Sequence, residues 1–514
     1  MEKKRGGLGR VMMFLTPGGG EMEEIDVVVV GGGNAGLCAA LAAAEKGARA
    51  VLLERAPAEK RGGNSFFTAG AFRFPYRGIE DVAEIVSDPL LENQDNLEIG
   101  QYTETDFLND LQRLTRHRAD PDMAGVLISL AFPTMKWLRE KGINLVLPYD
   151  RQSFLVDGKY RFWGGIIAKA KGEGPELVNA LYRACERYHV EVKYEARARA
   201  LQWDDATKLW KVIVAVERRP YQYLAGAVVL ACGGFEADPQ MRATYLGAGW
   251  DLVKVRGTPF NGGDGIRMAL EAGAQPYGHW SGCHAVAWDV NAPAYNERRL
   301  VQHYERDSYP LGICVNVRGE RFVDEGEDFR NYTYAKYGQE IMKQPGQIAF
   351  QVFDQKAVPL LKRPYTLPDA TRVEANTWAE LACKTGIDTQ GLERTMIEYN
   401  AAVSRGEFNP AMKDGKAALI ITPRKSNWAQ VLDRPPYVCF PVMCGITFTY
   451  GGIKVTPHAE VLDVDGRVMR GLYACGELIG GLFYHNYPGG SGLMAGAVFG
   501  RIAGQNAARL SGIR

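Results

Sequence analysis

A run of valines followed by a glycine-rich turn is the feature that most constrains the fold of this 514-residue chain. Val27–Val30 form a continuous apolar run, as expected for a strand that is buried on both faces. Gly31, Gly33 and Gly36 follow at the spacing Gly-x-Gly-x-x-Gly, and an alanine-rich helical stretch and a second short apolar run end at Glu54. Together these elements predict a dinucleotide-binding βαβ unit.

Each part of this unit has a mechanical reason. The first glycine makes the tight turn, the second lets the backbone approach a pyrophosphate, and the third lets helix and strand pack closely. The helix N-terminus presents free N–H groups to the phosphates, and the acid that ends the second strand can accept the ribose hydroxyls. The residues expected to bind the nucleotide here are Gly31, Gly33, Asn34, Ala35, Gly36, Glu54 and Arg55.

Four later segments return to the same theme of glycines and small polar residues. No second Gly-x-Gly-x-x-Gly that could hold a nicotinamide nucleotide is visible, so the sequence favours one long, extended cofactor, FAD. The residues of these four segments expected to contact FAD are Gly62, Gly63, Asn64, Ser65, Gly233, Gly234, Asp264, Gly476 and Glu477, and the glycine-rich tail adds Ser491, Gly492 and Leu493.

Composition excludes several other classes. The net charge of +1 gives no electrostatic footprint for nucleic acid. No apolar stretch long enough for a membrane span occurs, and the histidines lack metal-ligand spacing, so neither an integral membrane segment nor a metal site is expected. The nine cysteines form no C-x-x-C pair, which favours free thiols in the cytoplasm. Residues 1–22 are expected to be a disordered lead-in.

The order of the motifs "VVGGGNAG…LLE", "RGGNS", "ACGGFE", "GGDGIRMA", "GICVNVRGERFVDE", "TYGGIKV" and "GLYACGELIGG…NYPGGSG" resembles the fumarate reductase/succinate dehydrogenase flavoprotein superfamily. Within it, the tail looks closest to FAD-dependent tricarballylate dehydrogenases and shares a Tyr-Pro-Gly feature with 3-ketosteroid dehydrogenases. The resemblance implies an α/β fold: a Rossmann-like FAD-binding domain of the GR2 type (residues 23–279 and 447–514), interrupted by an α+β capping domain (residues 280–446).

The resemblance also implies site residues. A histidine that carries FAD covalently in some members is matched by Asn64, so non-covalent FAD is expected. The proton-carrying arginine of the reductases is matched by Arg330, one residue later than the family spacing. An arginine is a poor base and needs a relay, for which the segment Glu305–Asp307 (Glu305, Arg306, Asp307) is nearest in sequence. His284 matches a histidine that binds a substrate carboxylate.

Two cationic positions of the reductases are changed. One matches Thr447 or Phe448, and the other matches Tyr487, so a plain fumarate or succinate reaction is disfavoured. Tyr487 is a neutral donor for a ketone oxygen or for one carboxylate of a larger acid, and Tyr450 is a further candidate for the pocket wall. For both tyrosines, packing in the core is the alternative.

These features predict an FAD-dependent dehydrogenase that desaturates or reduces a C–C bond next to a carboxylate or carbonyl, with a tricarballylate-like polycarboxylic acid favoured. A desaturase of cyclic ketones or 3-ketosteroids is the second hypothesis, and a non-catalytic flavoprotein subunit of a larger complex is the third. No haem or iron–sulfur spacing is present, so a small-molecule substrate and a separate electron acceptor (a quinone, a partner protein or dioxygen) are expected.

Overall fold

The computed structural model describes four stretches of the chain: residues 13–15, 21–91, 94–216 and 219–512. Most of the segment expected to be disordered, 1–22, lies outside these residues. Its described part differs from that expectation, because β1 (Met13–Leu15) pairs antiparallel with the start of β2 (Glu21–Val30).

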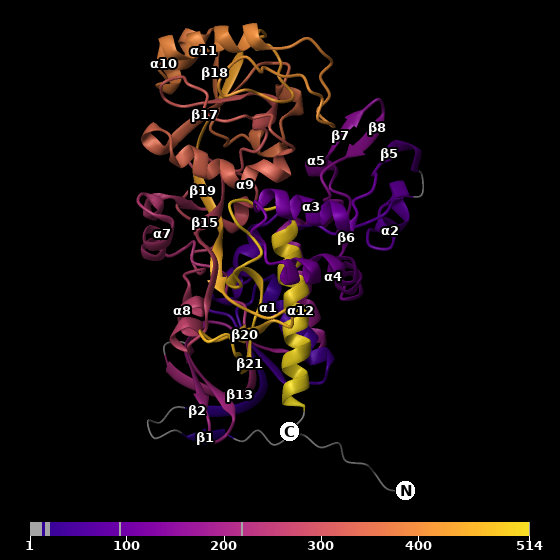
Figure 1. Ribbon diagram of the computed structural model, residues 1–514, viewed down its shortest axis with the longest axis vertical. Coiled ribbons are helices and arrows are strands. Elements are labelled where there is room, and N and C mark those ends of the chain that lie inside the picture. Colours follow the sequence, from indigo (N-terminus) through magenta and orange to yellow (C-terminus); the bar gives the residue numbers. More distant parts are fainter. Residues whose placement is uncertain (1–12, 16–20, 92–93, 217–218, 513–514) are drawn as a thin grey trace.

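A mixed sheet with a parallel centre forms the lower part of the molecule (Figure 1). Its centre is β2, with β3 (Ala50–Leu53) and β10 (Glu191–Lys193) on one side and β13 (Arg219–Leu230) on the other, all parallel to it. Residues 27–29 of β2 are fully buried, as predicted for a strand covered on both faces. β21 (Val468–Ala474) extends the sheet beyond β13. The α/β fold class expected from the sequence is confirmed.

Two helices cover one face of this sheet in close contact. α1 (Asn34–Glu45) follows β2 directly, and α12 (Ser491–Ser511) runs beside it. Gly496, Gly500 and Gly504 form the contact stripe on α12; a Cβ at Gly504, for example, would lie 2.0 Å from the carbonyl oxygen of Ala39. From Gly496 to Gly504, the α1 residues that contact this stripe also increase in sequence number. The two helices are therefore parallel, and their N-termini lie at the same end.

The remaining elements of the lower part complete the sheet and its covering layers. β11 and β12 extend β13 as an antiparallel meander, and β20 pairs with β21. These elements are α6 (Glu173–Arg187), β11 (Ala196–Asp204), β12 (Leu209–Val216), α7 (Pro239–Leu246), α8 (Asp264–Glu271) and β20 (Glu460–Leu462).

Two long antiparallel strands connect the lower part to an upper part (Figure 1). They are β15 (Pro276–Asp289) and β19 (Tyr437–Ile453). The expected domain boundaries at 279/280 and 446/447 fall inside these strands, so the sheet is continuous where the sequence suggests a division. That division stays a prediction.

The upper part, which we call the cap, is built on β19. β17 and β18 pair with it, β16 pairs with β17, and helices cover the sheet. Its elements are β14 (Lys254–Val255), β16 (Ile313–Val315), α9 (Arg330–Met342), β17 (Ile348–Phe353), β18 (Val373–Ala375), α10 (Trp378–Thr385) and α11 (Thr389–Ala402).

A side lobe between β4 and α6 in the chain packs against both parts (Figure 1). It contains β4 (Ala71–Phe72), α2 (Ile79–Ala83), β5 (Leu97–Glu98), α3 (Glu104–Leu114), α4 (Pro121–Glu140), β6 (Leu145–Val146), α5 (Tyr149–Gln152), β7 (Ser153–Val156), β8 (Lys159–Phe162) and β9 (Ala168–Ala170).

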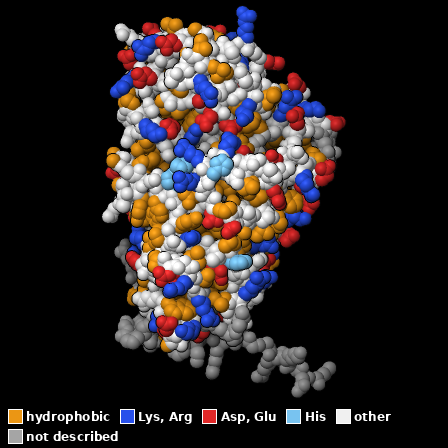
Figure 2. All heavy atoms as spheres, in the orientation of Figure 1, with side chains coloured by type: hydrophobic (Ala, Val, Ile, Leu, Met, Phe, Trp, Pro, Cys, Tyr) orange, Lys and Arg blue, Asp and Glu red, His pale blue; other side chains and the backbone are white. Residues whose placement is uncertain are grey.

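The charged side chains show no single-sign field on the face drawn in Figure 2, where blue and red groups are interspersed. This distribution agrees with the net charge of +1. No helix in the described part of the chain is both long enough and apolar enough to cross a membrane.

Candidate active site

A groove of about 860 Å³ opens where β2 and β3 end and α1 begins. Glu54, at the end of β3, turns back toward the glycine turn. Its Oε2 accepts a hydrogen bond from the Gly32 backbone at 3.1 Å, and its Oε1 accepts one from the Ala56 backbone at 2.8 Å. Burial raises the pKa of Glu54, and these backbone N–H groups oppose that shift. The acid is therefore held in place beside the glycine turn, and its role as a ribose ligand stays a prediction.

Most residues predicted to bind the nucleotide meet in this groove. Those that line it are Gly31, Gly33, Asn34, Ala35, Glu54, Arg55, Gly63, Asn64, Ser65, Gly233, Asp264, Gly476 and Glu477. Their roles as cofactor ligands stay predictions, but the chain brings them together from segments far apart in sequence.

Four predicted ligands line neither this groove nor the chamber beyond it, and act in packing. A Cβ at Gly36 would lie 1.9 Å from the carbonyl oxygen of Gly31, so this glycine lets α1 pack on the turn. Gly62 packs on Val178, and Gly234 packs on Thr449 and Glu477. The hydroxyl of Ser491 donates to the carbonyl oxygen of Pro488 at 2.5 Å. These positions shape the cradle from behind.

The groove continues into a second chamber of about 1060 Å³. Asn34, Ala35, Asn64, Ser65, Gly476 and Glu477 line both spaces. The second chamber begins at the N-terminus of α12, where Gly492 and Leu493 line it, and Asn34 Nδ2 donates to the Leu493 carbonyl oxygen at 2.8 Å. Two parallel helix N-termini thus face one continuous groove, which fits the phosphates and the ring of FAD.

Asn64 lies where the two spaces meet. Its amide nitrogen donates to Glu236 and to the carbonyl oxygen of Thr447 at 3.0 Å, and its side-chain oxygen accepts from the Thr258 backbone at 2.9 Å. An amide fully engaged in this way is no nucleophile toward a flavin methyl group. Non-covalent FAD stays the prediction for this site.

Three of the four predicted catalytic residues line the second chamber: Arg330, His284 and Tyr487. The fourth, Tyr450, does not. Its hydroxyl is buried without a hydrogen-bond partner among the described residues, and its ring packs edge-on against Phe448 at 5.6 Å. Phe448 lines the chamber in its place, so Tyr450 follows the core-packing alternative.

The wall beside α12 carries a pair of tyrosines. The hydroxyls of Tyr487 and Tyr334, which lies on α9, are 2.7 Å apart. The ring of His284 packs against both, at centroid distances of 4.9 Å and 4.8 Å. Burial raises the pKa of each tyrosine, and burial followed by Arg256 holds the pKa of His284 well below its usual value. All three side chains are therefore neutral at neutral pH.

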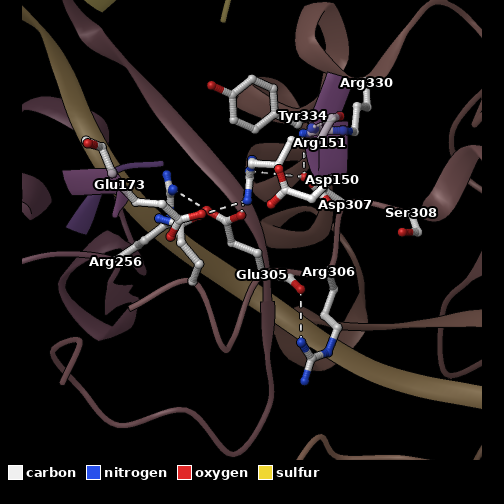
Figure 3. A network of polar contacts seen from close by, with 12 residues as sticks. Asp150, Arg151, Glu173, Arg256, Glu305, Arg306, Asp307, Ser308, Arg330 and Tyr334 are labelled. Atoms are coloured by element: carbon white, nitrogen blue, oxygen red, sulfur yellow. Dashed lines mark hydrogen bonds and ion pairs between the residues drawn. The ribbon is translucent and has the colours of Figure 1, made fainter. Parts of the chain in front are cut away.

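A second part of the chamber wall, next to Tyr334, is an arginine network (Figure 3). Arg330 Nη1 donates to Asp307 Oδ2 at 2.6 Å, and its Nη2 donates to the carbonyl oxygen of Arg151 at 2.6 Å. Arg151 also pairs with Glu305 at 3.0 Å and lies 3.7 Å from Asp307. Arg256 pairs with the other oxygen of Glu305. Three arginines thus face the chamber over two carboxylates.

The predicted relay segment splits in two. Glu305 and Asp307 join the network, whereas Arg306 points away and pairs with Asp289 at 2.5 Å (Figure 3). Burial raises the pKa of Glu305, but Arg256 and Arg151 outweigh it and lower that pKa to about 2. Glu305 therefore stays ionised and holds two arginines, while Asp307 is the direct partner of Arg330.

Three chamber residues were missed by reading the sequence. Tyr334 follows Arg330 by four residues on one helix, and the helical repeat could have pointed to it. Arg151 comes from α5 in the side lobe and Arg256 from the segment after β14. Neither belongs to a motif, and only the fold places them beside Arg330.

A glycine-turn nucleotide groove joined to a chamber lined by arginines and tyrosines is the arrangement expected of a flavin-dependent oxidoreductase. The comparison with known families agrees: the chain belongs to the FAD binding domain family, whose profile matches residues 26–493. The cofactor is FAD, and the predicted superfamily is confirmed.

Three known proteins show the range of similarity. A probable fumarate reductase (Ifc3) of Shewanella frigidimarina is 29% identical over 502 residues, covering 95% of this chain and 76% of the relative. A 4-oxocyclohexanecarboxylate 2-dehydrogenase of Sinomonas cyclohexanicum is 27% identical over 546 residues, covering 93% and 90%. The structure of 3-ketosteroid Δ1-dehydrogenase from Sterolibacterium denitrificans superposes with a TM-score of 0.71 at 21% identity, covering 95% and 99%. This last likeness concerns the fold.

Proposed function

We propose that the protein transfers two hydrogens across a C–C bond next to a carboxylate of a small polycarboxylic acid, of which tricarballylate is the favoured type. The observation that carries the proposal is the arginine wall of the chamber. Arg151, Arg256 and Arg330 line the chamber, whereas their partners Glu305 and Asp307 do not line it. Guanidinium groups that face the chamber favour an anionic substrate, because each can donate charge-assisted hydrogen bonds to a carboxylate.

Arg330 is the proposed proton carrier on the substrate side. When bound, the flavin supplies hydride transfer at one carbon, and the protein has to move a proton at the other. Arg330 Nη1 is already bonded to Asp307 Oδ2. The guanidinium can therefore take up a proton at one nitrogen while it releases another to Asp307, and so keeps its charge.

Arg256, His284 and the tyrosine pair are the residues proposed to orient the substrate. Arg256 Nε is buried without a hydrogen-bond partner in the described residues, and so is His284 Nε2. Both can serve substrate carboxylate oxygens. Of the two tyrosine hydroxyls, one donates to the other, which leaves one O–H group to donate to a further substrate oxygen.

The direct test is anaerobic mixing with tricarballylate. Reduction should bleach the absorption band of the oxidised flavin in the wild type, and Arg256→Met should abolish the change at the same substrate concentration. Arg299→Met is the matched control, since Arg299 is highly exposed and pairs only with Glu297 at the surface. A flavin that stays oxidised at millimolar tricarballylate in the wild type would contradict the proposed substrate.

A ketone is the second candidate, and the Tyr334–Tyr487 pair favours it. Two neutral phenols next to a neutral imidazole form a donor site for a carbonyl oxygen whose charge grows during the reaction. The relative named 4-oxocyclohexanecarboxylate 2-dehydrogenase acts on a molecule with both a ketone and a carboxylate. A panel of cyclohexanones with and without a carboxylate, assayed with an artificial acceptor, separates the two proposals.

The electron acceptor belongs to the same proposal. A quinone, a partner protein and dioxygen are the three acceptors to be compared, and turnover with each in separate assays distinguishes them. A cytoplasmic location likewise stays a prediction from the sequence.

A further inference from the structure

Two buried carboxyl groups meet where the nucleotide groove joins the chamber. Glu236 follows β13 and is 0% exposed. Glu477 lies in the short 3₁₀ helix Gly476–Leu478 after β21 and lines both spaces. Their carboxyl groups lie within hydrogen-bonding reach of each other. Two ionised carboxylates offer only acceptors, so a hydrogen bond between them requires one shared hydrogen.

The surrounding donors show which oxygen carries it. Glu236 Oε1 accepts from the amides of Asn64 and, at 2.7 Å, Asn261. Glu477 Oε1 accepts from the backbone and the hydroxyl of Thr449, at 2.8 and 3.2 Å. Glu236 Oε2 is buried and receives no hydrogen bond from the described residues. No donor of the described residues competes for this oxygen, so it can carry the shared hydrogen.

We propose that Glu236 is held as a neutral carboxylic acid which donates to ionised Glu477, so that the pair keeps one fixed negative charge beside the flavin. Glu236 and Glu477 are then positioning residues that tune the cofactor.

Among the described residues, no cationic side chain is hydrogen-bonded to the carboxyl oxygens of this pair. The guanidinium of Arg242 donates to the backbone carbonyl oxygen of Glu236, away from the carboxyl group. The thiol of Cys283, whose pKa burial raises, is neutral. Burial and then Glu477 raise the pKa of Glu236 well above its ordinary value, and burial also raises that of Glu477. If both carboxyl groups of the pair were ionised, two negative charges would lie side by side in one buried site.

The consequence concerns the reduction potential of the flavin. Adding electrons next to a fixed negative charge is disfavoured, so the charge lowers the potential. This inference rests on FAD binding alone and is independent of the substrate.

The decisive variants are amides, which keep the shape of the pair. Glu236→Gln still accepts at Oε1 and donates an N–H to Glu477, so the charge stays at one and the potential should equal that of the wild type. Glu236→Gln/Glu477→Gln removes the charge, and the potential should shift upward. Glu393→Gln, an exposed carboxyl on α11, is the matched control and should shift nothing. The potential is measured by equilibrium titration with redox dyes.

Infrared difference spectroscopy provides a second readout that needs no cofactor. The carbonyl stretch of a neutral carboxylic acid should be present in the wild-type apoprotein at neutral pH and lost in Glu236→Gln. It should also be lost in Glu477→Gln, because the new amide donates to Glu236 and lets it ionise. Any signal from the buried Glu54 is the same in every variant and therefore cancels in the difference spectra. The proposal is overturned if either single variant retains the band, or if Glu236→Gln raises the potential as far as the double variant does.

Discussion

Replacing Gly504 with alanine should force α12 away from α1. The added Cβ would lie 2.0 Å from the carbonyl oxygen of Ala39, whereas real Cβ atoms essentially never come closer than 3.0 Å to such an atom. The obstacle is backbone within a buried helix, so it cannot swing aside as a flexible side chain would. The two helices have to separate by about 1 Å, or the chain has to bend locally.

The magnitude follows from two opposing effects. Alanine gains about 1 kcal/mol of helix propensity over glycine. Overpacking a well-filled interface costs about 1–3 kcal/mol, and a clash with backbone belongs at or above the upper end. The expected net loss of unfolding free energy is about 2 kcal/mol, which lowers the Tm by a few degrees in a chain of this length.

The same displacement reaches the cofactor site. Asn34 Nδ2 and the Leu493 carbonyl oxygen, 2.8 Å apart, join the first turns of the two helices. Losing this bond and the alignment of the two N-termini should weaken FAD binding about tenfold, equivalent to ~1.4 kcal/mol. Thermal melts of the apoprotein and a fluorescence titration with FAD measure the two effects separately.

Gly125→Ala is the matched control. Gly125 is exposed on α4, and a Cβ there meets nothing within 4 Å. The identical chemical change should therefore stabilise the protein by about 0.5–1 kcal/mol and leave FAD binding unchanged. If Gly504→Ala melts at or above the wild-type temperature, close helix contact is not what limits this interface and the reasoning is refuted.

Three further predictions concern the chamber. Asp307→Asn removes the charged partner of Arg330 and should lower kcat by about 10²–10⁴ with a normal bound-flavin spectrum; an unchanged kcat would exclude Asp307 from proton transfer. Tyr487→Phe removes one hydroxyl of the pair and should raise KM about tenfold, as measured by steady-state kinetics, while an unchanged KM would show that the pair is structural. Because the folded state holds the pKa of His284 well below 6.5, the unfolded chain binds this proton more readily, and stability should fall as pH drops below about 6.5, by up to ~1.4 kcal/mol per pH unit from this group. Denaturant melts of His284→Gln should lack this contribution, and an equal pH slope in both proteins would contradict it.

The nucleotide groove could be predicted from sequence because its geometry is local. A strand, a glycine turn and a helix are consecutive, so the spacing of Gly31, Gly33 and Gly36 already specifies how the backbone approaches a phosphate. The prediction was less specific about what each glycine does. Gly36 shows the packing role predicted for it but does not line the groove, and Gly234, predicted as a ligand, packs on Thr449 and Glu477, because sequence spacing does not show which side of a turn is occupied.

The residues of the chamber come from distant parts of the sequence, so the sequence predicts only some of them. Arg330 and Tyr487 could be found from motifs, and the structure brings both to one space. Tyr450 was predicted as a further residue of the pocket wall, but it packs against Phe448, which lies two residues before it on β19, and does not line the chamber. Arg151 and Arg256 carry no local signal, since each is placed by an element whose partner in space is far away in the chain.

Arg151 and Arg256, which the motifs do not predict, change the argument about the charge of the substrate. Neither Thr447 nor Tyr487 carries a positive charge, so Arg330 is the one arginine that the motifs predict in the chamber. Arg151 and Arg256 bring cations to the same space from other elements and are held there by Glu305. The positive charge of the chamber therefore lies on the arginines around Arg330. Near the N-terminus of α12, the Tyr334–Tyr487 pair provides neutral hydrogen-bond donors. Under the proposed function, one carboxylate of the substrate contacts the arginines and another oxygen contacts the tyrosine pair, and the proposed larger acid offers both groups.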